Sequence, residues 1–229
     1  MADPAGRREV KQERAVRTRA AIMRAAAEVF AECGFSGAAV TKIVQRAGVT
    51  LGAMYFHFES KEALAREVVR EQPERVNPPF ESEGLQHAAD VTMTWAHQVP
   101  RDPYLLAGAR LVMEQELFVG PEWNSHRQWT QVVAQDLAVA LGRRELRKGV
   151  DINAVARLVV YACTGAQMHA NLESGRQDLP DRVREMWRAL LPAIATPSVI
   201  GRLQLDDSRG IVPAGSGKGS ARCSPVAQS

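Results

Sequence analysis

The segment 50–61 holds side chains that suit contact with a nucleic-acid backbone and with base edges. Four side chains carry hydroxyl, imidazole or ammonium groups that can bind phosphate oxygens: Thr50, Tyr55, His57 and Lys61. Leu51 and Gly52 stand at the start of a predicted helix, where a glycine permits close approach to bases. These residue types favour recognition of a duplex over catalysis.

Two short helix patterns in residues 38–62 position these groups. The first has apolar residues at helical spacing and ends at Gly48, whose backbone can take positive φ: Val40, Ile43, Val44 and Ala47. Thr50 can cap a second helix that runs to about His57. The layout indicates a helix-turn-helix, with Thr41 and Lys42 as further DNA contacts. A helix pair that serves packing alone is the alternative.

The positive charge of the chain lies near this segment. The net charge is +3, and the first 70 residues carry 12 Lys and Arg against 8 Asp and Glu. We expect residues 1–13 to form a flexible basic arm, and Arg14 and Arg17 to contact phosphates. A solvated terminal segment without such contacts is the alternative.

The remaining pattern predicts an all-α protein with two domains. A helix-turn-helix domain spans 14–59, with a first helix from about Arg14 to Glu32 that Gly34 ends, and a connecting helix capped by Ser60 spans 60–72. Prolines and glycines then divide a second helical domain, 73–196, into segments 83–99, 103–118, 122–142, 151–173 and 180–195. We expect a disordered tail over 197–229.

The segment 151–173 is apolar or small on nearly every side between Ala156 and Ala170. A helix of this kind needs burial all round, so we expect it to form a homodimer interface together with 180–195. A two-fold dimer presents two recognition helices to a palindromic operator. A central helix buried within a monomer is the alternative.

Residues 14–72 resemble the TetR family of bacterial repressors, through AAAEVFAECGFSGAAV, IVQRAGVTLGAMYFHF and SKEAL. Within that family the chain is most similar to receptors for γ-butyrolactones. The resemblance implies that 73–196 is a ligand-binding and dimerisation domain. It also implies a repressor that a small apolar lactone or furan signal releases from double-stranded DNA.

The resemblance also implies a ligand site, in which a Trp lies against the ligand ring and a Thr hydrogen-bonds the ligand. The matching positions are Trp129 and Thr164, with Trp123 as a second candidate for the Trp. Val133, Tyr161 and Met168 lie one or two helical turns from these positions and are expected to line the same cavity. The alternative makes Trp129 and Thr164 core residues, with the Thr hydroxyl bonded to the preceding turn.

Two positions depart from the family pattern: Leu51 stands where Lys or Arg is common, and Ala39 stands where a capping Ser or Thr is common. Both affect operator sequence and affinity. A regulator of hydrophobic drug response without a lactone ligand, or a dimeric interaction protein that has lost DNA binding, are the rival functions.

Neither an enzyme nor a metal or cofactor site is expected, because the histidines and the three cysteines form no catalytic or metal-ligand pattern. No apolar run reaches the ~20 residues of a membrane span. We therefore expect a cytoplasmic protein.

Overall fold

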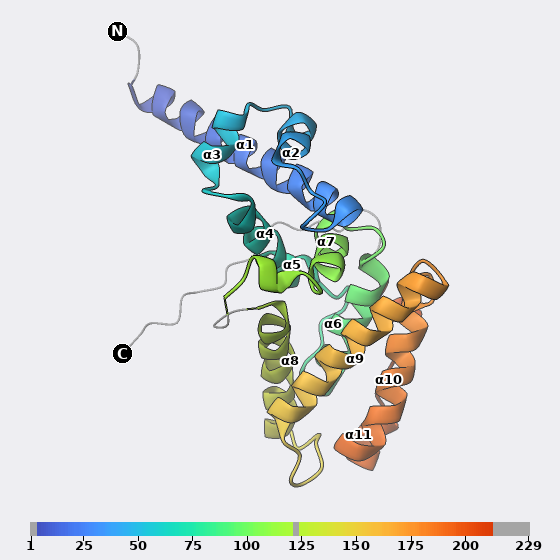
Figure 1. Ribbon diagram of the computed structural model, residues 1–229. Coiled ribbons are helices and arrows are strands. Elements are labelled where there is room, and N and C mark those ends of the chain that lie inside the picture. Colours follow the sequence, from blue (N-terminus) through green and yellow to red (C-terminus); the bar gives the residue numbers. More distant parts are fainter. Residues whose placement is uncertain (1–3, 121–123, 213–229) are drawn as a thin grey trace.

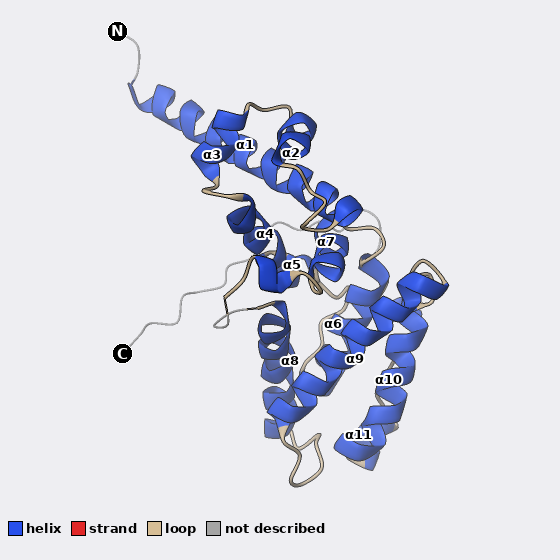
Figure 2. Cartoon of the chain, in the orientation of Figure 1, coloured by secondary structure: helices blue, strands red, loops and turns tan. Residues whose placement is uncertain are grey.

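The computed structural model describes residues 4–120 and 124–212, with side chains from Val10 onward. These residues form helices and no strand, although a single antiparallel bridge pairs Leu146 with Ala195 (Figures 1 and 2). The predicted all-α fold is confirmed. In chain order the elements are α1 (Pro4–Cys33), α2 (Val40–Ala47), α3 (Leu51–His57), α4 (Lys61–Arg70), α5 (Gln72–Arg75), α6 (Gly84–Gln98), α7 (Pro103–Leu111), η1 (Gln115–Leu117), α8 (Ser125–Gly142), α9 (Ile152–Glu173), α10 (Leu179–Ile194), α11 (Pro197–Ile200) and η2 (Asp207–Arg209).

The first helix begins ten residues earlier than the sequence pattern predicts. The expected flexible arm of 1–13 is wrong for residues 4–13, which form the first turns of α1 and project beyond the other N-terminal helices (Figure 1). The physical reason is local, since Ala, Arg, Glu, Lys and Gln dominate this stretch and all favour helix. Residues 1–3 lie outside the described chain. Arg14 and Arg17 therefore stand on a continuous helix.

Short-range signals fix the helix-turn-helix. Gly34 ends α1 at φ 72°, and Gly48 ends α2 at φ 66°. The Thr50 hydroxyl accepts from the Ala53 amide at 3.1 Å, and the Ser60 hydroxyl caps α4 in the same way. Ala39 precedes α2 and makes no side-chain cap bond, so the expected loss of that cap is confirmed.

The N-terminal core extends into the domain that follows. Buried residues from the first four helices include Phe30, Ile43, Met54 and Leu64, and the same cluster contains Leu111 of α7. Figure 1 shows α4 and α7 between the upper helices and the lower bundle. A shift in either helix therefore reaches the helix-turn-helix directly.

The lower bundle consists of α6, α8, α9 and α10 around the fully buried Trp187. The helix expected over 103–118 ends at Leu111, and the chain then turns into η1. The helices expected over 83–99, 122–142, 151–173 and 180–195 correspond to α6, α8, α9 and α10.

The expected disordered tail of 197–229 is wrong for residues 197–212. Val199 is buried, and the Arg209 guanidinium donates to Asp90, whose side chain is 1% exposed. Gln86 and Gln204 exchange two hydrogen bonds of 2.9 Å. Tertiary contacts therefore order a segment whose composition alone favours disorder. Residues 213–229 lie outside the described chain.

Candidate functional site

The predicted DNA-facing residues divide into an exposed group and an internally bonded group. On α3, Leu51 is 45% exposed and Tyr55 is 49% exposed, and Gly52 is open. The rest of the exposed group comprises Arg14, Arg17, Thr41 and Thr50, whereas His57 is half-buried. Arg17 has only a loose ion pair with Glu13, at 3.6 Å. That these exposed residues contact DNA stays a prediction.

Lys61 belongs to the internally bonded group. Its ammonium donates to the carbonyl oxygens of Phe35 and Ala38 at 3.0 and 3.2 Å, and it lies 4.2 Å from the Phe35 ring centroid. This contradicts the expected phosphate contact, because two of its three N–H groups are already used within the fold. The lysine instead ties α4 to the turn between α1 and α2.

Lys42 is ion-paired with Glu32 at 2.8 Å, and Arg46 also hydrogen-bonds Glu32. Hydrogen bonds from Arg46 and Lys42 lower the pKa of Glu32 to about 2. Because Glu32 is paired with Lys42, this carboxylate offsets part of the positive charge that Lys42 can offer to DNA.

The turn between α1 and α2 also receives hydrogen bonds from a residue of the C-terminal domain. The two carboxylate oxygens of Glu114 accept from the backbone N–H groups of Phe35 and Ser36, each at 3.0 Å. A Cβ at Gly34 would lie 2.3 Å from Glu114 Oε1, so the close approach requires glycine there. Glu114 thus joins the two domains at one point.

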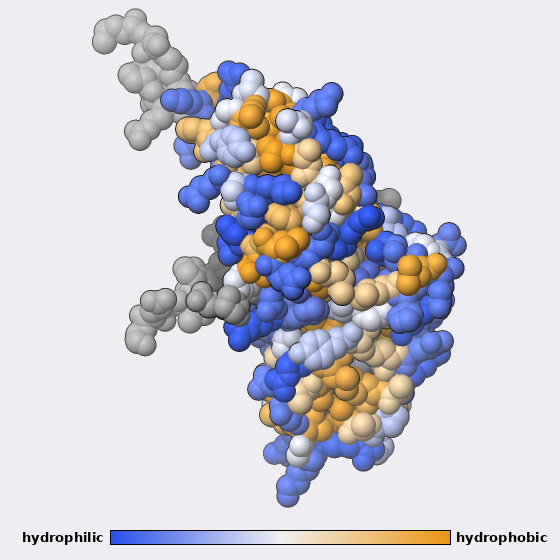
Figure 3. Space-filling view, in the orientation of Figure 1, coloured by the Kyte–Doolittle hydropathy of each residue, from blue (hydrophilic) through white to orange (hydrophobic). Residues whose placement is uncertain are grey.

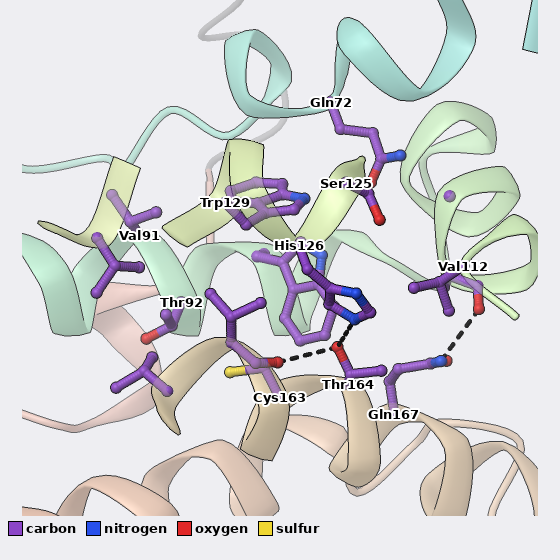
Figure 4. Close-up of a pocket in the computed structure, with 16 residues that line it drawn as sticks. Gln72, Val91, Thr92, Val112, Ser125, His126, Trp129, Cys163, Thr164 and Gln167 are labelled. Atoms are coloured by element: carbon purple, nitrogen blue, oxygen red, sulfur yellow. Dashed lines mark hydrogen bonds between the residues drawn. The ribbon is translucent and has the colours of Figure 1, made fainter. Parts of the chain in front are cut away.

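A cavity of about 60 Å³ lies in the helical bundle (Figure 4). Its walls come from the α5 region and from α6, α7, α8 and α9. The lining residues are Gln72, Val91, Thr92, Trp95, Gly108, Ala109, Val112, Ser125, His126, Trp129, Val133, Val159, Val160, Cys163, Thr164 and Gln167.

Hydrogen bonds connect the polar side chains in this wall. The Gln115 amide nitrogen lies 3.3 Å from His126 Nδ1 and can only donate, so the imidazole proton sits on Nε2. That proton points to Thr164 Oγ1 at 3.3 Å, and the Thr164 hydroxyl donates to the Val160 carbonyl at 2.9 Å. Gln167 donates to the Ala109 carbonyl at 3.0 Å.

Gln72 differs from these residues because its amide nitrogen has no hydrogen-bond partner among the described residues, although the side chain is only 3% exposed. A buried donor without a partner costs roughly 1–3 kcal/mol. Gln72 enters from the segment after α4 (Figure 4) and lies against Gly108, where a Cβ would come within 1.8 Å of the amide nitrogen. The glycine makes room for this side chain.

The cavity wall carries no charge at neutral pH. It contains no Asp, Glu, Lys or Arg, burial lowers the pKa of His126, and burial raises the pKa of Cys163 to about 12. A charged ligand would lose its hydration without gaining a counter-ion. The wall suits a neutral, mostly apolar molecule.

The structure places the predicted residues Trp129, Val133 and Thr164 in the cavity wall. The prediction that Tyr161 and Met168 line the cavity is wrong. Both lie outside it, and they are 56% and 37% exposed. The cavity-facing stripe of α9 runs through Val160, Cys163, Thr164 and Gln167, so Thr164 marks its edge and the other two lie beyond that edge. Trp123 lies outside the described residues.

The sequence prediction missed Gln72, Trp95, His126 and Gln167 as lining residues. One signal was present: Leu64, Val68 and Gln72 recur every four residues, which places a Gln on an otherwise apolar face.

The two parts of the chain each match a known protein family model. Residues 22–68 match bacterial regulatory proteins of the tetR family, and residues 82–196 match a tetracyclin repressor-like C-terminal domain. The chain belongs to the TetR family. As a TetR-family member it is a DNA-binding transcriptional repressor, and the resemblance inferred from its motifs is confirmed.

Three relatives indicate which TetR-family proteins this chain is similar to. The A-factor receptor protein of Streptomyces griseus is 40% identical over 197 residues, which are 85% of this chain and 70% of the relative. The crystal structure of tylp, a TetR regulator from Streptomyces fradiae, is 37% identical with a TM-score of 0.76, over 86% of this chain and 95% of that one. A gamma-butyrolactone receptor described as ArpA-like is 26% identical with a TM-score of 0.60, over 82% and 94%.

These three relatives are receptors or regulators by description, and the family consists of regulatory proteins. None of the helices in residues 4–120 and 124–212 combines the length and apolar character of a membrane span.

Proposed function

We propose that this TetR-family chain is a homodimeric repressor that leaves a palindromic operator when a small neutral ligand with a lactone or related furan head enters the cavity. The unpartnered amide nitrogen of Gln72 in an uncharged, largely apolar wall carries the proposal. A donor of this kind pairs with a carbonyl oxygen, and the wall around it accepts an alkyl chain. The similarity to a gamma-butyrolactone receptor supports the same ligand class.

Trp129 and Thr164 complete the proposed site. The indole of Trp129 supplies an aromatic plate against which a flat ring packs. The Thr164 hydroxyl already accepts from His126 Nε2–H and donates to the Val160 carbonyl, so the ligand gains little there unless it replaces one of these bonds. Gln72 is therefore the stronger hydrogen-bond partner for the carbonyl.

Homodimer formation is supported by the outer face of α9. Four side chains there are exposed although apolar or aromatic: Leu158 (52%), Tyr161 (56%), Met168 (37%) and Leu172 (81%). Figure 3 shows apolar side chains gathered over the lower half of the molecule, where α8 and α9 face the viewer. Contiguous apolar surface of this kind marks an interface, and a second copy of α9 is the occupant we propose.

The test begins with selection of duplex fragments by the purified protein. A palindrome with half-sites about one helical turn apart is expected for a two-fold dimer. Fluorescence anisotropy then measures operator affinity at several salt concentrations, where the logarithm of the affinity should fall linearly with the logarithm of salt. A panel of γ-butyrolactones and furans should weaken operator binding about 100-fold, which corresponds to about 2.7 kcal/mol of coupling.

Gln72→Leu is the informative variant. It should raise the lactone concentration needed for release by up to about tenfold, the equivalent of one neutral hydrogen bond. Gln177→Leu, an exposed site on the loop before α10, is the matched control and should leave release unchanged. If no lactone or furan releases the operator and an apolar drug lacking a carbonyl does, the rival regulator of hydrophobic drug response replaces this proposal.

A further inference from the structure

The recognition helix α3 lacks the side chains that commonly read bases by paired hydrogen bonds. Guanine is read by Arg or Lys and adenine by Asn or Gln, and none of these stands between Leu51 and His57. Within α3, ring nitrogens occur only in His57, which is the last residue of the helix. The N-terminal turn of α3 must therefore recognise sequence in another way.

The neighbouring hydroxyl group is held in place by the fold. Thr50 Oγ1 accepts the Ala53 amide N–H at 3.1 Å as the helix cap, which fixes this side chain against the first turn. The turn is also open to close approach, because no atom lies within 4 Å of where a Cβ at Gly52 would be. Both features favour Leu51 as the first side chain of α3 to reach a base edge.

Leu51 is exposed and apolar. It is 45% exposed, and Tyr55, one turn further along the same face, is 49% exposed. Phe56 is more exposed still, at 81%, but it points to a different side of the helix. The one apolar group that a base presents in the major groove is the 5-methyl group of thymine.

We infer that Leu51 reads the 5-methyl group of a thymine in each operator half-site. The inference rests on the operator binding described above and adds the base class at one position. Specificity at that position then comes from an apolar contact, so thymine is favoured over cytosine and uracil without a hydrogen bond to the side chain.

The size of the effect follows from one buried methyl group. Its transfer from water corresponds to about a fourfold change in affinity for one half-site, and to about fifteenfold when both half-sites are changed. The measurement uses the full-length protein and the palindrome recovered by selection. Each thymine is replaced in turn by deoxyuridine, which removes only the methyl group, and anisotropy gives the dissociation constant.

Leu51→Ala is the matched protein variant, and the exposed Leu141→Ala at the end of α8 is its control. We expect one symmetric pair of thymines at which deoxyuridine weakens binding by about fifteenfold in the parent and in Leu141→Ala. The penalty should nearly vanish in Leu51→Ala. Placing 5-methylcytosine where cytosine replaces that thymine should recover part of the affinity for the parent alone.

Two results overturn the inference while leaving the repressor function intact: a palindrome with no thymine sensitive to loss of its methyl group, or a penalty that is equal in the parent and in Leu51→Ala. Failure to select any duplex sequence would instead count against the proposed operator function itself.

Discussion

Replacing Glu114 with glutamine should weaken the joint between the DNA-binding helices and the C-terminal bundle. The carboxylate accepts the Phe35 and Ser36 N–H groups at 3.0 Å each. Glutamine keeps one acceptor oxygen but turns an NH₂ group toward the second N–H, so one of the two bonds is lost. The surviving bond also loses its charge assistance.

The magnitude follows from these two contacts. A hydrogen bond to a charged group contributes about 1.5–3 kcal/mol, and the exposed Ser36 amide can recover part of its share by bonding to water. We therefore expect Glu114→Gln to lower the free energy of unfolding by about 2 kcal/mol. Urea denaturation followed by circular dichroism measures this difference.

The effect should depend on pH. Burial raises the pKa of Glu114, but the hydrogen bonds from Ser36 and Phe35 lower it by more, so the net pKa lies below the ordinary 4.5. A carboxyl whose folded pKa is lowered stabilises the protein above its unfolded pKa, and that contribution is lost as the pH falls through the folded value. The difference between parent and Glu114→Gln should thus be full at pH 7 and shrink below about pH 4.5.

Glu116→Gln provides the control, because Glu116 is an exposed carboxylate only two residues away in η1. It should change stability by less than about 0.5 kcal/mol. If the two variants lose equal stability, or if the Glu114→Gln difference does not change with pH, the reasoning about this joint is wrong.

Two further predictions concern the bundle. His87 Nδ1–H donates to the Asp136 carboxylate at 2.9 Å, and this hydrogen bond raises the pKa of His87 above 6.5 despite partial burial. The pair therefore stabilises the fold fully below pH 6.5 and less as the pH rises through the folded pKa. His87→Asn should therefore cost more stability at pH 5.5 than at pH 8.5, as urea midpoints would show, and an equal cost at both would contradict it. Arg209→Met should cost about 3 kcal/mol by leaving the buried Asp90 carboxylate without its counter-ion, and adding Asp90→Asn should recover part of this loss in thermal unfolding. Additive losses would refute the pairing.

Local signals explain why the helix-turn-helix could be predicted from sequence. Thr50 and Ser60 as caps, and Gly34 and Gly48 as helix ends, act within four residues of where they stand, so their effects are visible in the sequence. The start of α1 was misjudged for a related reason. Positive charge suggested a flexible arm, yet the same Arg and Lys residues favour helix.

The errors at the candidate site have a tertiary cause. Lys61 bonds to carbonyls 23 and 26 residues away, and Arg209 reaches Asp90 across 119 residues. Neither partner can be identified from spacing alone. Tyr161 and Met168 lie about one helical turn from Thr164, but a helix that is apolar all round gives no indication of which side faces the cavity.

For the proposed ligand-responsive repressor, the size of the cavity offers a physical link between ligand entry and DNA release. At about 60 Å³ it is far smaller than the ~300–1,000 Å³ of ordinary ligand sites, so a lactone with an alkyl chain can enter only by displacing a wall. The wall at Gln72 continues directly into α4, where Leu64 and Val68 are fully buried in the N-terminal core and Arg66 donates to the Phe118 carbonyl at 2.8 Å.

Under the proposed mechanism, displacement of Gln72 should shift α4 against the helix-turn-helix instead of being absorbed locally, because a packed core transmits strain. The required coupling of about 2.7 kcal/mol equals the burial of three or four methylene groups. Apolar surface contributes to this coupling free energy only if it is buried when the ligand has enlarged the cavity and is not buried without the ligand. The alkyl chain of the ligand, more than its hydrogen-bonding head, should therefore determine how completely the repressor is released.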